Sequence, residues 1–254
     1  MERLDDSSGT VRTARVLVAL GGHDAPVGVS QLSRELEISK TAVHRILRSL
    51  VASGLATADP ATRRYELGPA AIGLGRRAAA HSRLVNATAP YLAHLGALTG
   101  ETTTLAARVG HRRVYVDQVE SSRHIRIAIG IGETQSLANG ASGLSILAFV
   151  SPLDIDLVLS TPLPRFTPRT VVDPAEIRAR LETIRQRGWA HTSSERVPHS
   201  SSIAAPVFDA VGAPVGSVSV AYLESRFPDQ EAAEVAKLVL AAAQGASDRL
   251  RDQN

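Results

Sequence analysis

The chain has 254 residues, of which 44% are hydrophobic and 21% charged, with a formal net charge of +3. It contains no cysteine, which excludes disulfides, zinc fingers, iron–sulfur clusters and thiol catalysis. No apolar run approaches the roughly 20 residues of a membrane span, and the opening MERLDDSSGT does not resemble a signal peptide. We therefore expect a cytoplasmic protein without a membrane partner.

Positive charge is concentrated in one part of the chain. Within residues 40–83, 8 Lys and Arg residues stand against 2 Asp and Glu residues, whereas residues 86–254 carry 16 against 17. A local basic excess is expected of a surface that meets a polyanion.

The N-terminal part reads as short helices. Thr10 to Leu20 has apolar residues on one face, and a stretch with glycine and proline follows at 21–28. Ser30 is expected to cap a second helix, whose Leu32 and Leu36 face inward.

A third helix is expected to begin after the N-cap Ser39 and to end at Gly54. Its apolar residues recur at helical spacing, and polar or basic residues occupy the remaining turns. The predicted buried face consists of Val43, Ile46, Leu47, Leu50 and Val51. Two helices joined by a tight turn, the second longer and basic, form a helix-turn-helix.

The segment 55–68 predicts two short strands joined by a turn at Pro60, with Arg63 and Arg64 near the tip. A hairpin behind the second helix of a helix-turn-helix is a wing, so residues 1–68 predict a winged helix-turn-helix that binds double-stranded DNA. Taken alone, the basic helix could equally be an ordinary solvated helix. The candidate DNA-binding residues are Ser39, Lys40, Thr41, His44, Arg45, Arg48, Arg63 and Arg64.

The rest of the chain predicts a second domain, at 83–254, behind a linker helix at 69–82, with a helix break near Gly73–Gly75 or at Ser82. Mixed strands and helices indicate an α+β fold. The expected elements are a hairpin turning at Gly110–Arg112, a strand at 124–130, a glycine-rich segment leading into a helix at 138–150, a helix from Pro174 to about Arg187, a hairpin at 203–222, and a helix from Pro228 to about Arg251.

Residues 29–75, with KTAVHRIL at 40–47 and YELG at 65–68, resemble the winged-helix domain of IclR-type (isocitrate lyase regulator) bacterial transcriptional regulators. Blocks at 100–121, 167–190 and 201–220 resemble that family's second domain in order. The resemblance implies a GAF-like effector domain, homodimers that commonly pair into tetramers, and no cofactor. It implies a regulator, which we expect to be a repressor, acting on a palindromic operator under the control of a small organic-acid effector.

Transferred from the resemblance, the effector-binding residues are Gly140, Ala141, Ser202 and Ser219. A covered pocket also needs apolar walls, for which Leu137, Ile146 and Ile203 are the candidates. Amides and hydroxyls suit a small anion. The alternative is that these are ordinary turn glycines and strand serines. The sequence departs from the family pattern at Ala138, Leu144, Thr192 and His199, which removes a His, a Lys, an acid and a Gly.

The sequence gives weaker support to two other functions. A serine hydrolase is disfavoured because GASG at 140–143 lacks the G-x-S-x-G spacing, and His191 and His199 have no further ligand at metal spacing, so we expect neither catalytic residues nor a metal. The second domain could instead be an oligomerisation platform without a ligand.

Overall fold

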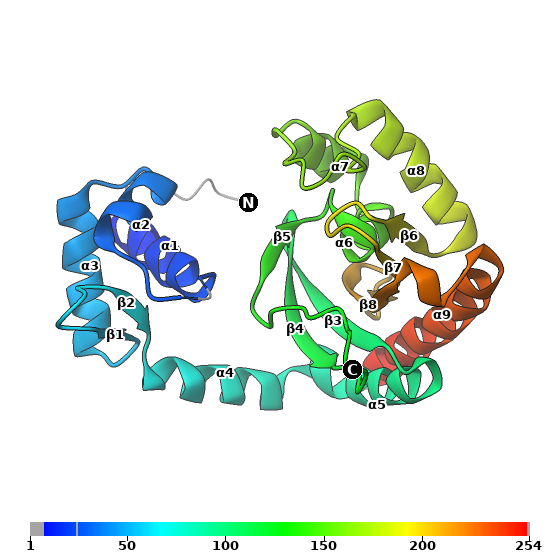
Figure 1. Ribbon diagram of the computed structural model, residues 1–254, viewed down its shortest axis with the longest axis horizontal. Helices are drawn as coiled ribbons and strands as arrows, with labels where there is room; N and C mark the ends of the chain where they lie inside the picture. Colours follow the sequence, from blue (N-terminus) through cyan, green and yellow to red (C-terminus); the bar gives the residue numbers. More distant parts are fainter. Residues whose placement is uncertain (1–7, 24, 253–254) are drawn as a thin grey trace. The chain divides into compact units, whose positions relative to one another are not determined.

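The structure is a computed structural model that describes residues 8–23 and 25–252. The chain divides into two compact units, one ending at Ala80 and the other beginning at His81 (Figure 1). Most of the opening segment judged unlike a signal peptide lies outside the described residues. Among the helices that are described, none is long and apolar enough to cross a membrane.

The N-terminal unit begins with three helices and a two-stranded hairpin. They are α1 (Gly9–Gly21), α2 (Val29–Leu36), α3 (Lys40–Ala52), β1 (Ala56–Ala58) and β2 (Tyr65–Leu67). One face of each helix is buried in a common core with the hairpin. The predicted winged helix-turn-helix is thus confirmed as a fold.

The core fixes how α3 is oriented. Val43 and Leu47 are fully buried, and Ile46 and Leu50 nearly so, while Val51, predicted on the same face, is 38% exposed. Before α3, Glu37 adopts a left-handed conformation at φ 58°.

The predicted cap of α2 was wrong. The helix starts at Val29, so Gly28 is its N-cap and Ser30 lies in the first turn. Helix α2 begins earlier in the chain than predicted, because the backbone of Val27 pairs with Tyr65 and fixes the chain just before the helix.

A separate helix, α4 (Pro69–His81), follows the wing and buries none of its residues. The break falls at Ser82 and not at the glycines, and the Ser82 hydroxyl caps α5 (Arg83–Thr99) by accepting a hydrogen bond from the Val85 amide at 3.3 Å.

The C-terminal unit is built on a six-stranded antiparallel sheet in the order β5-β4-β3-β8-β7-β6. The strands are β3 (Thr102–Val109), β4 (Arg112–Val119), β5 (Thr134–Ser136), β6 (Ala190–Ser193), β7 (Ser200–Phe208) and β8 (Pro214–Leu223). Both predicted hairpins, β3–β4 and β7–β8, are confirmed.

Helices cover both faces of this sheet (Figure 1). α5 and α9 (Asp229–Asp252) pack on one face, and α6 (Gly140–Leu147), α7 (Pro152–Leu159) and α8 (Pro174–Arg187) pack on the other, with a short 3-10 turn at Glu224–Arg226. The mixed α+β class is confirmed, and α8 and α9 match the predicted helices.

The structure differs from the sequence-based expectations at two places. Residues 124–130 form an irregular loop and not a strand, and α7 was not predicted. The loop keeps its shape through side chains of other elements: the Thr102 hydroxyl donates to the Ile127 carbonyl at 2.8 Å, and Arg226 donates to the carbonyl of Ile125. These contacts replace the hydrogen bonds of a strand.

Candidate DNA interface and ligand pocket

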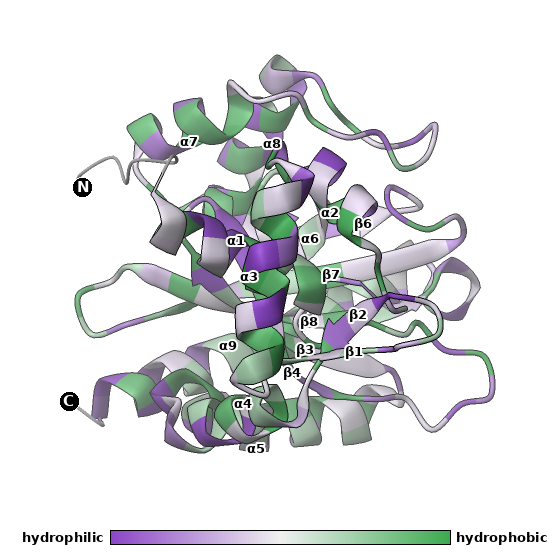
Figure 2. Cartoon of the chain, turned by 90° about the vertical axis from the view of Figure 1, so that its left-hand side faces the viewer, coloured by the Kyte–Doolittle hydropathy of each residue, from purple (hydrophilic) through white to green (hydrophobic). Residues whose placement is uncertain are grey.

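The solvent-facing side of α3 carries the predicted DNA-binding residues. Ser39, Lys40, Thr41, His44, Arg45 and Arg48 are all exposed. Hydrophilic positions alternate with apolar ones along this helix (Figure 2). The side chains of Lys40, His44, Arg45 and Arg48 form no ion pair or hydrogen bond with any residue of 8–23 or 25–252, so α3 offers donors and positive charge that the described fold does not use.

Two of the predicted DNA-binding residues, Ser39 and Arg64, also form hydrogen bonds within the N-terminal unit. The Ser39 hydroxyl accepts a hydrogen bond from the Ala42 amide at 3.3 Å, which confirms it as the cap of α3. In the wing, Arg64 donates to the Pro26 carbonyl at 2.9 Å, whereas Arg63 is exposed at the tip with φ 55°. Arg63 is therefore better placed than Arg64 to reach a separate molecule.

Asp59 shapes the wing. Its carboxylate accepts hydrogen bonds from the Thr62 hydroxyl at 2.6 Å and from the Ala61 amide at 2.8 Å. These bonds lower the pKa of Asp59. Arg63 is consequently presented on an ordered turn.

A cavity of about 100 Å³ lies in the C-terminal unit, where β4, β7 and the first turn of α6 meet the 124–130 loop. Of the four predicted effector-binding residues, Gly140, Ala141 and Ser202 line it. Ser219 does not. It lies behind the wall, buried, where its hydroxyl bonds Thr104 at 2.6 Å and Ser142 at 3.1 Å.

The departures from the family pattern mostly lie away from the cavity. Ala138 and Leu144 belong to the apolar core beneath α6, and His199 is exposed outside the lining. Only Thr192 reaches it, and its hydroxyl accepts a hydrogen bond from the Ala141 amide at 3.2 Å. The threonine thus satisfies one of the amides that a helix start leaves free.

The predicted apolar walls were wrong. Leu137 and Ile146 pack in the core under α6, and Ile203 packs against α5 and α9, because successive residues of a strand face opposite sides of the sheet. The apolar lining comes instead from Ile127, Ile129, Val197 and Ala221.

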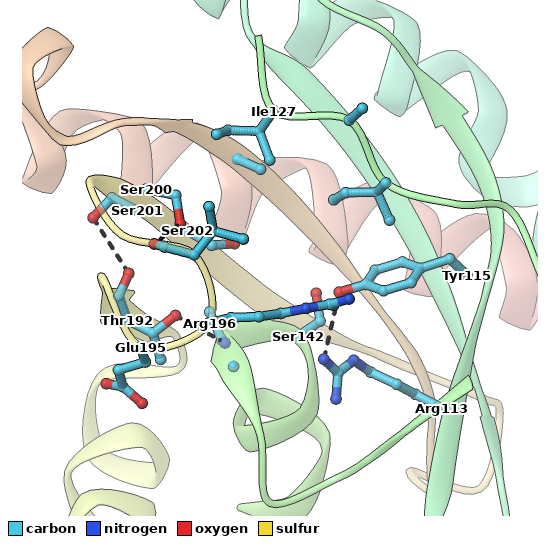
Figure 3. A pocket seen from close by; sticks show the side chains of 16 residues that line it. Arg113, Tyr115, Ile127, Ser142, Thr192, Glu195, Arg196, Ser200, Ser201 and Ser202 are labelled. Carbon is cyan, nitrogen blue, oxygen red and sulfur yellow. Dashed lines mark hydrogen bonds between the residues drawn. The ribbon is translucent and has the colours of Figure 1, made fainter. Parts of the chain in front are cut away.

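Sequence reasoning missed the charged and aromatic lining. Arg113 and Tyr115 reach the cavity from β4, Ser142 from α6, and Arg196 from the loop between β6 and β7 (Figure 3). Strand alternation was the available signal, since it places Arg113 and Tyr115 on the same side of β4.

The charges at the cavity influence two pKa values. Burial alone would raise the pKa of Tyr115, but the nearby charge of Arg113 and its hydrogen bond outweigh it and lower the pKa. Burial raises the pKa of Glu195, although Arg180 bonds its carboxylate at 2.6 Å and opposes the shift. The positive charge of Arg113 therefore acts directly on the Tyr115 hydroxyl.

The structure does not assemble hydrolytic or metal chemistry from the histidine-rich segment. His191 bonds the Ser201 hydroxyl at 3.0 Å on adjacent strands, and His199 lies apart from this pair, outside the lining. The part of the chain that the structure describes contains no group of three or more His, Asp or Glu residues arranged to hold a metal.

Comparisons with known proteins agree with both units. The family model described as bacterial transcriptional regulator IclR C-terminal matches residues 76–248, and the IclR helix-turn-helix model matches residues 9–60. The chain is 33% identical over 216 residues to the HTH-type transcriptional regulator BhcR of Paracoccus denitrificans, covering 85% of this chain and 77% of that protein.

Solved structures show the same fold. An IclR transcriptional regulator from Silicibacter sp. TM1040 matches with a TM-score of 0.85 and 27% identity over 96% of each chain. An IclR homolog from Microbacterium hydrocarbonoxydans, complexed with 4-hydroxybenzoate, matches with a TM-score of 0.77 and 22% identity over 96% of this chain and 100% of that one.

These relatives are named as transcriptional regulators and not as enzymes, which decides against the hydrolase. Together with the exposed basic helix of a winged domain, the two matching family models lead to one conclusion: this chain is a DNA-binding transcriptional regulator of the IclR family.

Proposed function

We propose that the protein is a repressor whose affinity for its operator is controlled by a small organic-acid effector bound in the cavity of the C-terminal unit. One observation carries the DNA-binding part: the exposed side chains of Lys40, His44, Arg45 and Arg48 on α3 have no ion-pair or hydrogen-bond partner among the described residues. Repression is the simpler outcome, because occupancy of a promoter excludes polymerase without needing a further surface. Action on chromosomal DNA would make the protein cytoplasmic.

The DNA-binding proposal gives each part of the surface a task. Lys40 and Thr41 at the start of α3 approach base edges in the major groove, with His44, Arg45 and Arg48 further along the helix. Arg63 in the wing contacts the backbone, and Ser39 and Arg64 chiefly hold the helix and the wing in place. We propose that the chain comprises a DNA-binding domain at 1–68, a linker helix at 69–82 and an effector domain at 83–254.

We propose a homodimer that pairs into a tetramer and reads a palindromic operator. The support is the unburied α4, where Ile72 is 66% and Leu74 59% exposed. Large apolar side chains exposed on one helix favour a protein interface, and two-fold symmetry would repeat α3 at half-sites about one helical turn apart.

The effector proposal rests on the polar lining. Gly140 begins α6, whose first amides lack intrahelical acceptors, and Ser142 and Ser202 add hydroxyls. The competing function, an oligomerisation platform without ligand, predicts a packed apolar interior here, whereas the cavity is lined by charged and polar side chains.

The DNA-binding part can be tested without knowing the operator. Duplexes that bind the full chain are selected from a random pool, and affinity for the selected duplex is measured by fluorescence anisotropy. Arg45→Ala and Arg48→Ala should each weaken binding by roughly 5- to 150-fold, the range for one good arginine contact. Lys237→Ala, which removes an exposed charge from α9, is the control and should bind normally. Unchanged affinity in both arginine variants would refute the assignment of α3.

A further inference from the structure

Arg113 is the most unusual charged residue of the C-terminal unit. Its side chain is 1% exposed, so nearly all contact with water is lost. One terminal nitrogen donates to the Ser136 carbonyl at 2.6 Å and the other to the Tyr115 hydroxyl at 3.4 Å, while Nε has no hydrogen-bond partner. No carboxylate of the described residues forms an ion pair with it. A buried charge without an opposite charge is expensive, and proteins rarely keep one without use.

The other charged side chains at the cavity are balanced. Arg196 forms an ion pair with Glu133, and Glu195 forms one with Arg180 at 2.6 Å. Arg113 therefore supplies one uncompensated positive charge to the lining.

The positive N-terminal end of α6 lies against the Arg113 guanidinium. The first turn of α6 lies against it so closely that a Cβ on Gly143 would be 2.5 Å from its Nη1, and a Cβ on Gly140 would be 3.4 Å from its Nη2. The N-terminal end of a helix carries partial positive charge and unpaired amides. Two positive groups at one buried place repel each other unless an anion lies between or beside them. The lowered pKa of Tyr115 agrees with this field.

We infer that Arg113, together with the first turn of α6, binds the carboxylate of a compact monoanionic effector. This inference rests on the proposed effector-binding function and deepens it. One uncompensated charge matches a monoanion and not a dicarboxylate. The cavity of about 100 Å³ is smaller than the ~150 Å³ cavity that accommodates benzene and far below the roughly 300 Å³ at which pockets for drug-sized ligands begin. The class that fits is therefore an acid of roughly two to four carbons, and an aromatic acid is too large.

The test measures thermal stability of the full chain without DNA. Acetate, glyoxylate, pyruvate, lactate and propionate are compared at equal ionic strength with lactamide and propionamide, which have no charge. Succinate tests a dianion, benzoate tests size, and inorganic phosphate tests an anion without a carboxylate. At a concentration about a hundredfold above Kd, a bound acid should raise Tm by roughly 5–10 °C.

Substitutions at Arg113 test whether this side chain binds the acid. Arg113→Met should weaken binding of the stabilising acid by roughly 10- to 100-fold, the usual size of a charge-assisted hydrogen bond, and Arg113→Lys should keep part of the affinity. Arg112→Met, at an exposed neighbour on the same strand, should respond like the wild type. Without acid, Arg113→Met should be at least as stable as the wild type, because an unpaired buried charge has been removed; a purely structural arginine would instead lower Tm.

The inference is overturned if no compact acid stabilises the wild type, if the amides, succinate, benzoate or phosphate stabilise it as well as the acids, or if Arg113→Met keeps the full response. It is also overturned if ligand-free Arg113→Met melts below the wild type while Arg113→Lys does not. These readouts do not involve DNA. A protein that binds a small acid through Arg113 but ignores it on the operator would leave this inference standing and refute the proposed control of DNA binding.

Discussion

Replacing Gly143 with alanine should deform the floor of the cavity. The added Cβ would lie 2.5 Å from Nη1 of Arg113 and 2.6 Å from the carbonyl oxygen of Leu137. Contacts this short require movement, and the Leu137 contact is with backbone, which cannot rotate away as a side-chain end can. Either the start of α6 shifts or the buried guanidinium does.

The expected cost follows from two opposing effects. Alanine in a helix interior is favoured over glycine by about 1 kcal/mol, while overpacking of a tight interior costs about 1–3 kcal/mol. With a backbone atom in the clash we expect the upper part of that range, and thus a net loss of about 1–2 kcal/mol. For a chain of this size Tm should fall by roughly 2–8 °C.

The assay is thermal unfolding followed by circular dichroism, with and without the stabilising acid. Gly75→Ala in α4 is the matched control, since nothing lies within 4 Å of its added Cβ, and it should retain or slightly raise Tm. A Gly143→Ala protein that melts at or above the wild-type Tm and still responds to acid would refute the close packing of α6 on Arg113.

Three further outcomes are expected. Ser219→Ala combined with Gly140→Val should abolish the effector response but keep DNA binding, since Val is strained at the φ of 67° found at Gly140. If the double variant still releases DNA normally when effector is added, the effector binds at another site. Ser39→Ala should destabilise the N-terminal unit by about 1 kcal/mol in urea denaturation through loss of the α3 cap, and an unchanged midpoint would show that the cap is dispensable. Burial raises the folded-state pKa of Glu195, so the native state holds this proton at pH values where the unfolded state has already lost it. The wild type should therefore lose stability relative to Glu195→Gln as the pH rises above 4.5 and through the folded-state pKa. A stability difference that stays constant with pH would contradict this.

The sequence was most informative where local chemistry decides the structure. The cap at Ser39 and the apolar spacing of Val43 and Leu47 defined α3, and the Pro174 start defined α8. It was misleading at 124–130, where alternating isoleucines suggest a strand. Their backbone is held instead by Thr102 and Arg226, residues distant in sequence, and no local pattern reveals such contacts.

The site was only partly predictable for the same reason. Gly140, Ala141 and Ser202 were proposed from the family resemblance and do line the cavity, but resemblance could not show that Ser219 lies behind Ser142. Arg113 was missed because an arginine on a strand is ordinarily expected in solvent. Its burial depends on how α6 packs against β4, which is a tertiary arrangement.

The coupling between the cavity and α3 is measured most directly by titrating the selected duplex with the full chain, in the presence and absence of the acid that stabilises it. The account predicts that the acid weakens DNA binding by roughly 5- to 150-fold, the usual range of allosteric coupling, and that Arg113→Met binds the duplex normally but no longer responds. By linkage the duplex should weaken acid binding by the same factor. Equal DNA affinity with and without saturating acid would contradict the claim that this protein is an acid-controlled repressor.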